Sequence, residues 1–145
     1  FGTVCSTTKF SDCTTESIVA AYDNTILYTD NVINQAIDML MNQKEIDSSL
    51  IYFADHGEAL GEKNMFLHGT PVVISPIEQR HVPMLMWMSD GFQDRLRLRR
   101  SCLDARRALP YSHDNVFHSI LGLLGVSTSV YKPELDILNG CTNAE

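Results

Sequence analysis

The sequence has no run of apolar residues close to the roughly 20 that a helix needs to span a bilayer, and it carries no secretory signal peptide. We therefore expect a soluble chain. Positive charge is scarce as well: 11 Lys and Arg residues stand against 18 Asp and Glu residues, which gives a formal net charge of -7 at pH 7. This balance does not predict a general nucleic-acid-binding surface.

The C-x-x-C spacing of redox and zinc motifs is also absent. The four cysteines are Cys5, Cys13, Cys102 and Cys141, and no two of them are three positions apart. An even count is compatible with two disulfides and equally with four buried thiols. The count alone does not decide between these two states.

The few basic residues are gathered in one part of the chain. Residues 95–107 hold six of the eleven Lys and Arg residues. Such a cluster is compatible with contact to anionic lipid headgroups or with a solvated surface segment. We favour the solvated surface.

A short apolar segment, Leu50–Ala54, breaks at once into Asp55, His56, Gly57 and Glu58. Its length and its Ile, Tyr and Phe content predict a buried strand. The polar cluster therefore stands at a carboxyl end of a strand, where α/β folds bind their ligands. Because a carboxylate oxygen and an imidazole nitrogen suit Zn²⁺, Asp55 and His56 are a candidate metal half-site.

An isolated Asp-His pair more often has a structural role, with Asp55 capping a turn and His56 exposed to solvent. Two adjacent residues fill only two corners of a tetrahedral zinc site, so further ligands must come from elsewhere. A second histidine, His68, follows twelve residues after His56. For Glu58 three roles are open, namely contact with a second metal, support of a ligand histidine, or exposure to water, and we favour the support of a histidine.

Residues 52–88 read YFADHGEALGEKNMFLHGTPVVISPIEQRHVPMLMWM. This stretch resembles the signature region of the bacterial lipid A phosphoethanolamine transferases, a family that includes the mobile colistin-resistance enzymes. The resemblance runs from about Cys5 to Cys141 and includes the segments AYDNTILYTDNVI and SHDNVFHSILGLLGV. It implies an α/β fold, the alkaline-phosphatase and sulfatase-like sandwich, of which residues 1–145 are the C-terminal portion.

The resemblance also implies a function. The enzyme would move phosphoethanolamine from phosphatidylethanolamine to lipid A at the periplasmic face of the bacterial inner membrane, and so confer resistance to polymyxin and colistin. In the family pattern the Asp-His pair ligates zinc, which assigns Zn²⁺ to Asp55 and His56. The histidine of the HGTP motif lines the phosphate site, which makes His68 the expected catalytic residue.

Other parts of the family pattern are not found in this sequence. The resemblance places a threonine nucleophile, an acidic zinc ligand, another active-site histidine and a transmembrane anchor upstream of the motif. We therefore expect residues 1–145 to be the C-terminal part of a periplasmic catalytic domain, inactive alone, with the anchor and the N-terminal half of that domain absent. Thr70 is a poor substitute for the nucleophile because it has no adjacent base. The first residue, Phe1, is not an initiator methionine, which fits the expectation of a processed or cut chain.

Two alternative functions remain open. A related sulfatase or phosphoglycerol transferase would share the Asp-His-Gly motif, and only the longer HGTP and HVPMLMWM stretches argue against it. A non-catalytic metal-binding module is the other alternative, because no nucleophile is identified in the chain.

The periplasm is an oxidising compartment, so the resemblance favours disulfides over free thiols. We expect Cys5 to pair with Cys13, holding a loop over residues 1–15. Cys102 is then expected to pair with Cys141.

Periodicity and capping signals predict further elements. Apolar residues at three- and four-residue intervals predict a long helix that starts after Thr14 or Thr15 and ends near residues 42–44. Residues 81–88 predict a second buried strand, with Pro83 near its start.

The C-terminal third of the chain gives weaker signals. Residues 89–110 are expected to be irregular. Ser112 is expected to cap a helix over His113–Leu124, with Gly125 just beyond its end. The apolar face of this helix is expected to consist of Val116, Phe117, Ile120, Leu121 and Leu124. Residues 131–141 are expected to form a closing loop.

The remaining polar residues are expected to be structural. His81 flanks a predicted strand, and a histidine in such a position is usually structural. His113 and His118 are five residues apart, which is a poor spacing on a helix for shared metal ligation.

Overall fold

The computed structural model describes residue 5, residue 7 and residues 9–142. The chain divides into two compact units, Phe1–Trp87 and Met88–Glu145. The part of the predicted loop over residues 1–15 that falls at residues 1–4, 6 and 8 lies outside the described residues.

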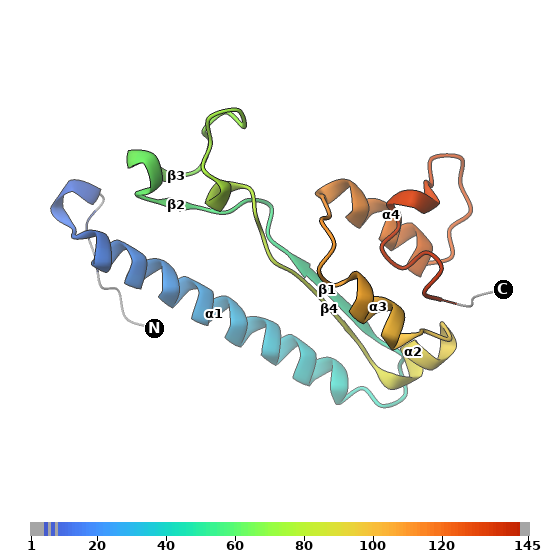
Figure 1. Cartoon of the computed structure of the whole chain (residues 1–145). Coiled ribbons are helices and arrows are strands. Elements are labelled where there is room, and N and C mark those ends of the chain that lie inside the picture. The colour runs from blue at the N-terminus through green and yellow to red at the C-terminus, as the bar shows by residue number, and fades with distance from the viewer. Residues whose placement is uncertain (1–4, 6, 8, 143–145) are drawn as a thin grey trace. The chain divides into compact units, whose positions relative to one another are not determined.

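The first unit contains the predicted long helix, α1, which spans Thr15–Met41 (Figure 1). Its N-cap is Thr14, whose side-chain oxygen accepts a hydrogen bond from the backbone N–H of Ser17 at 3.2 Å. The helix ends with Asn42 as its C-cap, where the sequence predicts its end. It packs against the strands β1 and β2, which carry the candidate site.

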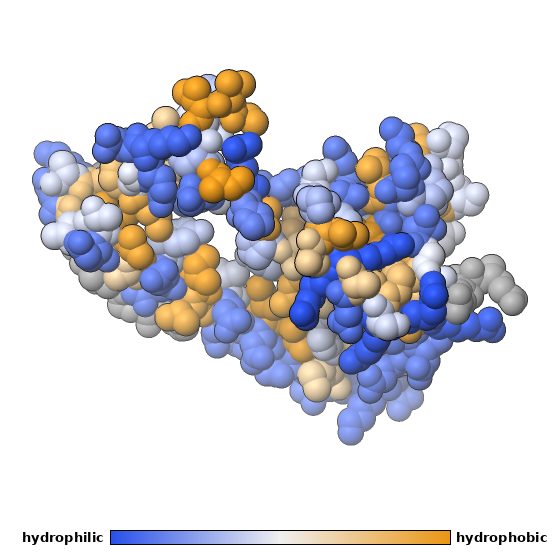
Figure 2. Space-filling view, in the orientation of Figure 1, coloured by the Kyte–Doolittle hydropathy of each residue, from blue (hydrophilic) through white to orange (hydrophobic). Residues whose placement is uncertain are grey.

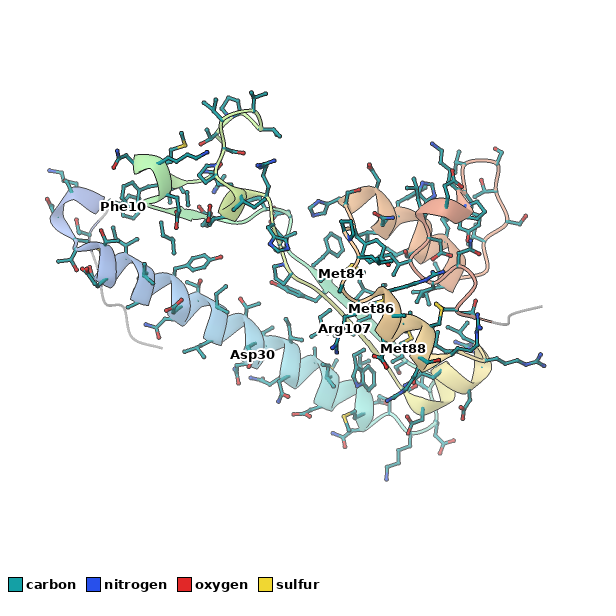
Figure 3. All side chains as sticks on the ribbon, viewed as in Figure 1. Phe10, Asp30, Met84, Met86, Met88 and Arg107 are labelled. Atoms are coloured by element: carbon teal, nitrogen blue, oxygen red, sulfur yellow. A yellow bond between two sulfur atoms is a disulfide. The ribbon has the colours of Figure 1, made fainter. Side chains whose placement is uncertain are left out.

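Strand β1 spans Ser49–Phe53 and pairs with β4, Met84–Met88, in a two-stranded sheet. Both strands were predicted, and β4 begins directly after Pro83. Burial is less complete than expected, because the residues of β1 are only partly buried and Phe53 is 39% exposed. The side chains of Met84, Met86 and Met88 leave β4 at alternate positions and share one face of the strand (Figure 3).

A small antiparallel hairpin follows β1. Strands β2, Ala59–Leu60, and β3, Phe66–Leu67, pair with Ala59 opposite Leu67. The two strands are connected through the 3-10 helix η2 at Glu62–Asn64. The hairpin is joined to the N-terminal segment by the stacked rings of Phe10 and Phe66, whose centroids are 5.9 Å apart.

The remaining described elements of the first unit are two 3-10 turns. η1 spans Phe10–Asp12, ahead of α1. η3 spans Ile77–Gln79 and precedes β4.

The second unit corrects the expectation of an irregular segment over residues 89–110. This segment contains two short helices, α2 at Asp90–Arg95 and α3 at Arg100–Arg106. The N-cap of α2 is Ser89, whose side-chain oxygen accepts a hydrogen bond from the backbone N–H of Phe92 at 3.3 Å.

Helix α4 spans His113–Leu123, close to the predicted bounds. The backbone N–H of its N-cap Ser112 donates to Asn115 Oδ1 at 2.8 Å, and Gly125 beyond its C-terminus has a φ of +63°. The buried face differs from the apolar face expected from the sequence. It consists of Val116, His118 and Ser119, whereas Phe117 is 52% exposed.

The segment after α4 packs on this buried face. It includes the 3-10 turn η4, Pro133–Leu135, followed by the buried residues Asp136, Ile137 and Leu138. The buried Ser119 hydroxyl accepts a hydrogen bond from the backbone N–H of Ile137 at 2.9 Å. The expected closing loop is therefore a packed part of the second unit.

Both predicted disulfides are present. Cys5 bonds to Cys13 with 6.1 Å between the Cα atoms, and Cys102 bonds to Cys141 with 5.5 Å between the Cα atoms. Each disulfide joins residues of one unit. Within the described part of the chain, no helix combines the length and the apolar character needed to cross a membrane.

Candidate metal centre

The candidate site begins where β1 ends. Asp55 is the second residue after the strand, and its side chain is 88% exposed. Its Oδ1 atom accepts the backbone N–H of His56 at 3.0 Å. That hydrogen bond is the largest cause of a lowered pKa for the Asp55 carboxyl group. The backbone N–H of Asp55 and the positive charges of His56 and His68 lower this pKa further. Asp55 is therefore poised as a carboxylate ligand.

Asp55 and His56 are close enough to share one metal ion. Asp55 Oδ2 lies 3.8 Å from His56 Nε2. Two zinc ligands that are each about 2.1 Å from the ion are separated by at most about 4.2 Å. The turn after β1 thus brings the two predicted ligand atoms to the same side of the loop.

A second set of donors overlaps the first. His56, Glu58 and His68 each offer one ligand atom, and these three atoms lie within 4.8 Å of one another. Glu58 Oε1 is 2.7 Å from His68 Nδ1 and 4.0 Å from His56 Nδ1. The two imidazole rings have centroids 4.0 Å apart. His56 therefore belongs to both donor sets.

Glu58 is the least exposed side chain of this cluster, at 23%. Its second oxygen, Oε2, is buried and has no hydrogen-bond partner among the described residues. An unpaired buried carboxylate oxygen is costly, and a cation would remove that cost. Two carboxylates and two imidazoles are a donor set that fits zinc.

The expected contact between Glu58 and a histidine is present, and the histidine is His68. The cluster also influences its neighbour on α1, because burial and then the negative charge of Glu58 raise the pKa of Tyr22. The structure therefore groups His56, Glu58 and His68 and places Asp55 beside His56.

Gln79 positions the two loops that carry these residues. Its side chain is buried, and its Nε2 atom donates to the carbonyl oxygen of Leu67 at 2.8 Å and to Thr70 Oγ1 at 3.2 Å. Its own carbonyl oxygen accepts the backbone N–H of Gly57 at 3.1 Å. Sequence reasoning missed this residue, because nothing in the local pattern around Gln79 indicates burial.

Gly57 is needed at this contact. A Cβ atom at position 57 would collide with the backbone carbonyl oxygen of Glu78. Only glycine lets the η3 turn approach the loop after β1 this closely. The backbone of one loop is thereby fixed against the backbone of the other.

Two other histidines have different surroundings. His118 lies in the second unit, buried, with Nδ1 accepting the backbone N–H of Lys132 at 3.1 Å. This confirms the expected packing role. His81 is exposed, and its structural role stays a prediction.

The basic segment over residues 95–107 is more than a solvated surface. Arg99 donates to the carbonyl oxygen of Gly140, and Arg106 donates to that of Ile137 at 2.7 Å. Arg100 Nε donates to Gln93 Oε1 at 2.9 Å. Arg99 and Arg106 therefore hold the C-terminal segment of the second unit against α3, and Arg100 joins α3 to α2.

Comparison with known proteins identifies a family, a curated relative and two solved structures that this chain resembles. Residues 3–126 match the sulfatase family. The phosphoethanolamine transferase EptA of Salmonella typhimurium is 43% identical over 143 residues, which are 97% of this chain and 26% of that protein. The chain therefore spans about a quarter of the length of this curated relative.

Two solved structures share the fold. One is the integral membrane protein lipooligosaccharide phosphoethanolamine transferase A of Neisseria meningitidis, with a TM-score of 0.93 and 39% identity over 99% of this chain and 27% of that chain. The other is the C-terminal periplasmic domain of the phosphoethanolamine transferase EptC of Campylobacter jejuni, with a TM-score of 0.83 and 40% identity over 97% of this chain and 44% of that chain.

Proposed function

Because the chain belongs to the sulfatase family, with phosphoethanolamine transferases among its relatives, we propose that it carries part of the zinc site of such a transferase. The reaction moves phosphoethanolamine from phosphatidylethanolamine to lipid A. The observation that carries this proposal is the cluster of His56, Glu58 and His68, whose ligand atoms lie within 4.8 Å of one another, with Asp55 beside His56 and an unpaired buried oxygen on Glu58.

In this proposal Asp55 and His56 hold the zinc ion. When bound, the ion lowers the pKa of the attacking hydroxyl and neutralises charge on the phosphoryl oxygens. Glu58 accepts a hydrogen bond from His68 Nδ1 and so fixes the orientation of the ring. His68 Nε2 then remains for a phosphoryl oxygen or for the leaving group of the transfer.

The nucleophile and the remaining acidic ligand are proposed to come from parts of the whole protein outside these 145 residues. Thr70, the threonine of the HGTP motif, is bound instead to Gln79. Covalent phosphoryl transfer needs an activated nucleophile. The 145-residue chain alone, with zinc supplied, is therefore expected to be inactive.

The test compares turnover of a labelled phosphatidylethanolamine analogue by the whole protein and by its Asp55→Ala, His56→Ala and His68→Ala variants. Each variant is expected to lose at least about 100-fold in kcat, because it removes a ligand or a group that contacts the transferred phosphate. His113→Ala, in the second unit, is the matched control and should retain activity. Full activity of His56→Ala would overturn the zinc assignment.

We also place this reaction at the periplasmic face of the inner membrane. Phosphoethanolamine adds an amine to lipid A, which lowers its negative charge and weakens its attraction for cationic polymyxins. Expression of the whole protein in a susceptible bacterium should raise the inhibitory concentration of colistin. The His56→Ala protein, expressed at the same level, should not raise it.

A further inference from the structure

The loop between β3 and the η3 turn presents an apolar tip. Val72 is 68% exposed, Val73 95%, Ile74 53% and Ile77 55%. The loop stands at the top of Figure 1, and Figure 2 shows an orange tip there above a mostly blue surface. Contiguous exposed apolar groups of this kind mark a binding surface for a protein or a membrane.

The tip belongs to a longer uncharged stretch. Residues 65–77 contain no Asp, Glu, Lys or Arg. Phe66 and Leu67 at the start of this stretch are 40% and 50% exposed. The exposed apolar residues of α1 differ, because acidic side chains such as Asp23 and Asp30 are interspersed among them.

Two backbone N–H groups and two carbonyl groups of the loop are paired within the loop itself. The carbonyl oxygen of Pro71 accepts the N–H groups of Ile74 and Ser75, both at 3.0 Å. The Ser75 hydroxyl donates to the carbonyl oxygen of Val72 at 3.2 Å. These bonds lower the cost of moving this part of the loop towards lipid, because backbone groups that leave water unpaired are costly.

The base of the loop is joined to the metal centre. Gln79 bonds Thr70 at one end of the loop and Gly57 in the segment that follows His56. His68 lies two residues before Thr70. The apolar tip is therefore held at a fixed position relative to the cluster of His56, Glu58 and His68, and so is any partner that binds the tip.

We propose that the loop over residues 70–77 inserts its apolar tip into the interfacial region of a phospholipid bilayer. A narrow convex tip is a poor basis for a stable protein interface, which buries roughly 800 Å² on each partner, whereas a bilayer accepts small apolar protrusions without a complementary surface. The solved relative from Neisseria meningitidis is an integral membrane protein, which favours a bilayer as the partner. The insertion presents the metal centre to lipid headgroups, a consequence that rests on the proposed function.

The first test measures binding of the 145-residue chain to vesicles of equal parts phosphatidylethanolamine and phosphatidylcholine by co-sedimentation. Val73→Asp places a charge at the tip and is expected to lower the partition coefficient at least about tenfold. Val130→Asp is the matched control, because Val130 is 56% exposed in the second unit. It is expected to bind as the unaltered chain does.

The second test reads insertion directly. Val73→Trp and Val130→Trp are compared for quenching of fluorescence by brominated lipids in the same vesicles, with Trp87, the only tryptophan of the chain, as the common background. Stronger quenching is expected for Val73→Trp.

Three results would overturn the proposal. They are failure of the unaltered chain to bind vesicles, equal binding by the two Asp variants, and equal quenching of the two Trp variants. Self-association of the chain that Val73→Asp abolishes, without vesicle binding, would assign the loop to a protein interface instead. Neither test needs turnover, so a failed transferase assay and a failed vesicle assay are separate outcomes.

Discussion

Glu58 has one carboxylate oxygen bound to His68 and a second, buried oxygen with no partner among the described residues. The first oxygen orients an imidazole, and the second is suited to a cation. These two properties make Glu58 the residue whose charge most directly tests the metal assignment.

Glu58→Gln preserves the size of the side chain and removes its charge. We expect zinc affinity to fall by about 10- to 100-fold, because the buried Oε2 atom, which has no partner among the described residues, no longer belongs to a charged carboxylate near the metal ligands. Competition with a chelating dye measures this affinity. Glu45→Gln, at an exposed position after α1, is the control and should bind zinc unchanged.

Gly57→Ala is expected to destabilise the first unit by about 1–3 kcal/mol. The added Cβ meets the carbonyl oxygen of Glu78, and one of the two backbones must move. Urea unfolding followed by the fluorescence of Trp87 measures the change. The same substitution at the exposed Gly91, inside α2, should be neutral or stabilising, and a loss as large as that at Gly57 would contradict the steric argument.

At this scale the sequence predicts the site in part. Asp55 and His56 follow an apolar strand, and His68 stands in a motif long enough to be specific, so all three are identified without coordinates. Gln79 is not recognised from the sequence, because its burial results from contacts with Leu67, Thr70 and Gly57 that only the folded chain makes. A glutamine in a polar local sequence ordinarily predicts exposure.

Among the elements, α4 and the segment packed on it depend on buried polar groups. Asp136 is buried, and its carboxylate accepts a hydrogen bond from the Tyr131 hydroxyl at 2.7 Å. The backbone of Gly122 on α4 approaches this carboxylate so closely that a Cβ atom there would collide with it. The contact joins the helix to the C-terminal segment.

This contact predicts an alkaline transition. Burial first, then the hydrogen bond to Asp136 and its negative charge, raise the pKa of Tyr131 to about 12. Because the folded state holds this proton more tightly than an unfolded tyrosine with its pKa of about 10, the stabilisation is complete below pH 10 and is lost as pH rises towards 12.

The Tyr131→Phe variant tests this pH dependence by two measurements. The ultraviolet titration of tyrosinate should lose its most alkaline component. The free energy of unfolding should be lower than that of the unaltered chain below pH 10, and the difference should shrink between about pH 10 and pH 12. A constant difference over this range would contradict the argument.

Helix boundaries were more predictable than helix faces. Thr14 and Ser112 are local capping signals, and α1 and α4 begin directly after them. Helices α2 and α3 were missed because six or seven residues are too short to show a helical period. The buried face of α4 was misjudged because Ser119 is buried by its hydrogen bond to the backbone of Ile137 in the C-terminal segment rather than by apolarity.

For the whole molecule, the two disulfides close loops of very different length. The sequence separation is 8 residues for Cys5 and Cys13 and 39 residues for Cys102 and Cys141. A longer loop loses more entropy from the unfolded state when it is closed. The second disulfide also anchors the segment that the arginines of α3 hold.

Removing each pair by double substitution to alanine should show this difference. We expect a loss of about 4 kcal/mol for Cys102→Ala with Cys141→Ala, and of about 2.5 kcal/mol for Cys5→Ala with Cys13→Ala. Urea unfolding followed by circular dichroism measures both. Equal losses would indicate that loop entropy is not the main contribution.

The spacing of these cysteines also sets an order of events during synthesis. Cys5 and Cys13 emerge almost together, well before residue 102, and the loop between them is short. Once these two have paired, Cys141, 39 residues after Cys102, is the remaining partner of Cys102 within this chain. Of the three ways to pair four cysteines, the order of emergence thus favours the native one, and a reducing cytosol that holds the first pair open would remove this protection against mispairing.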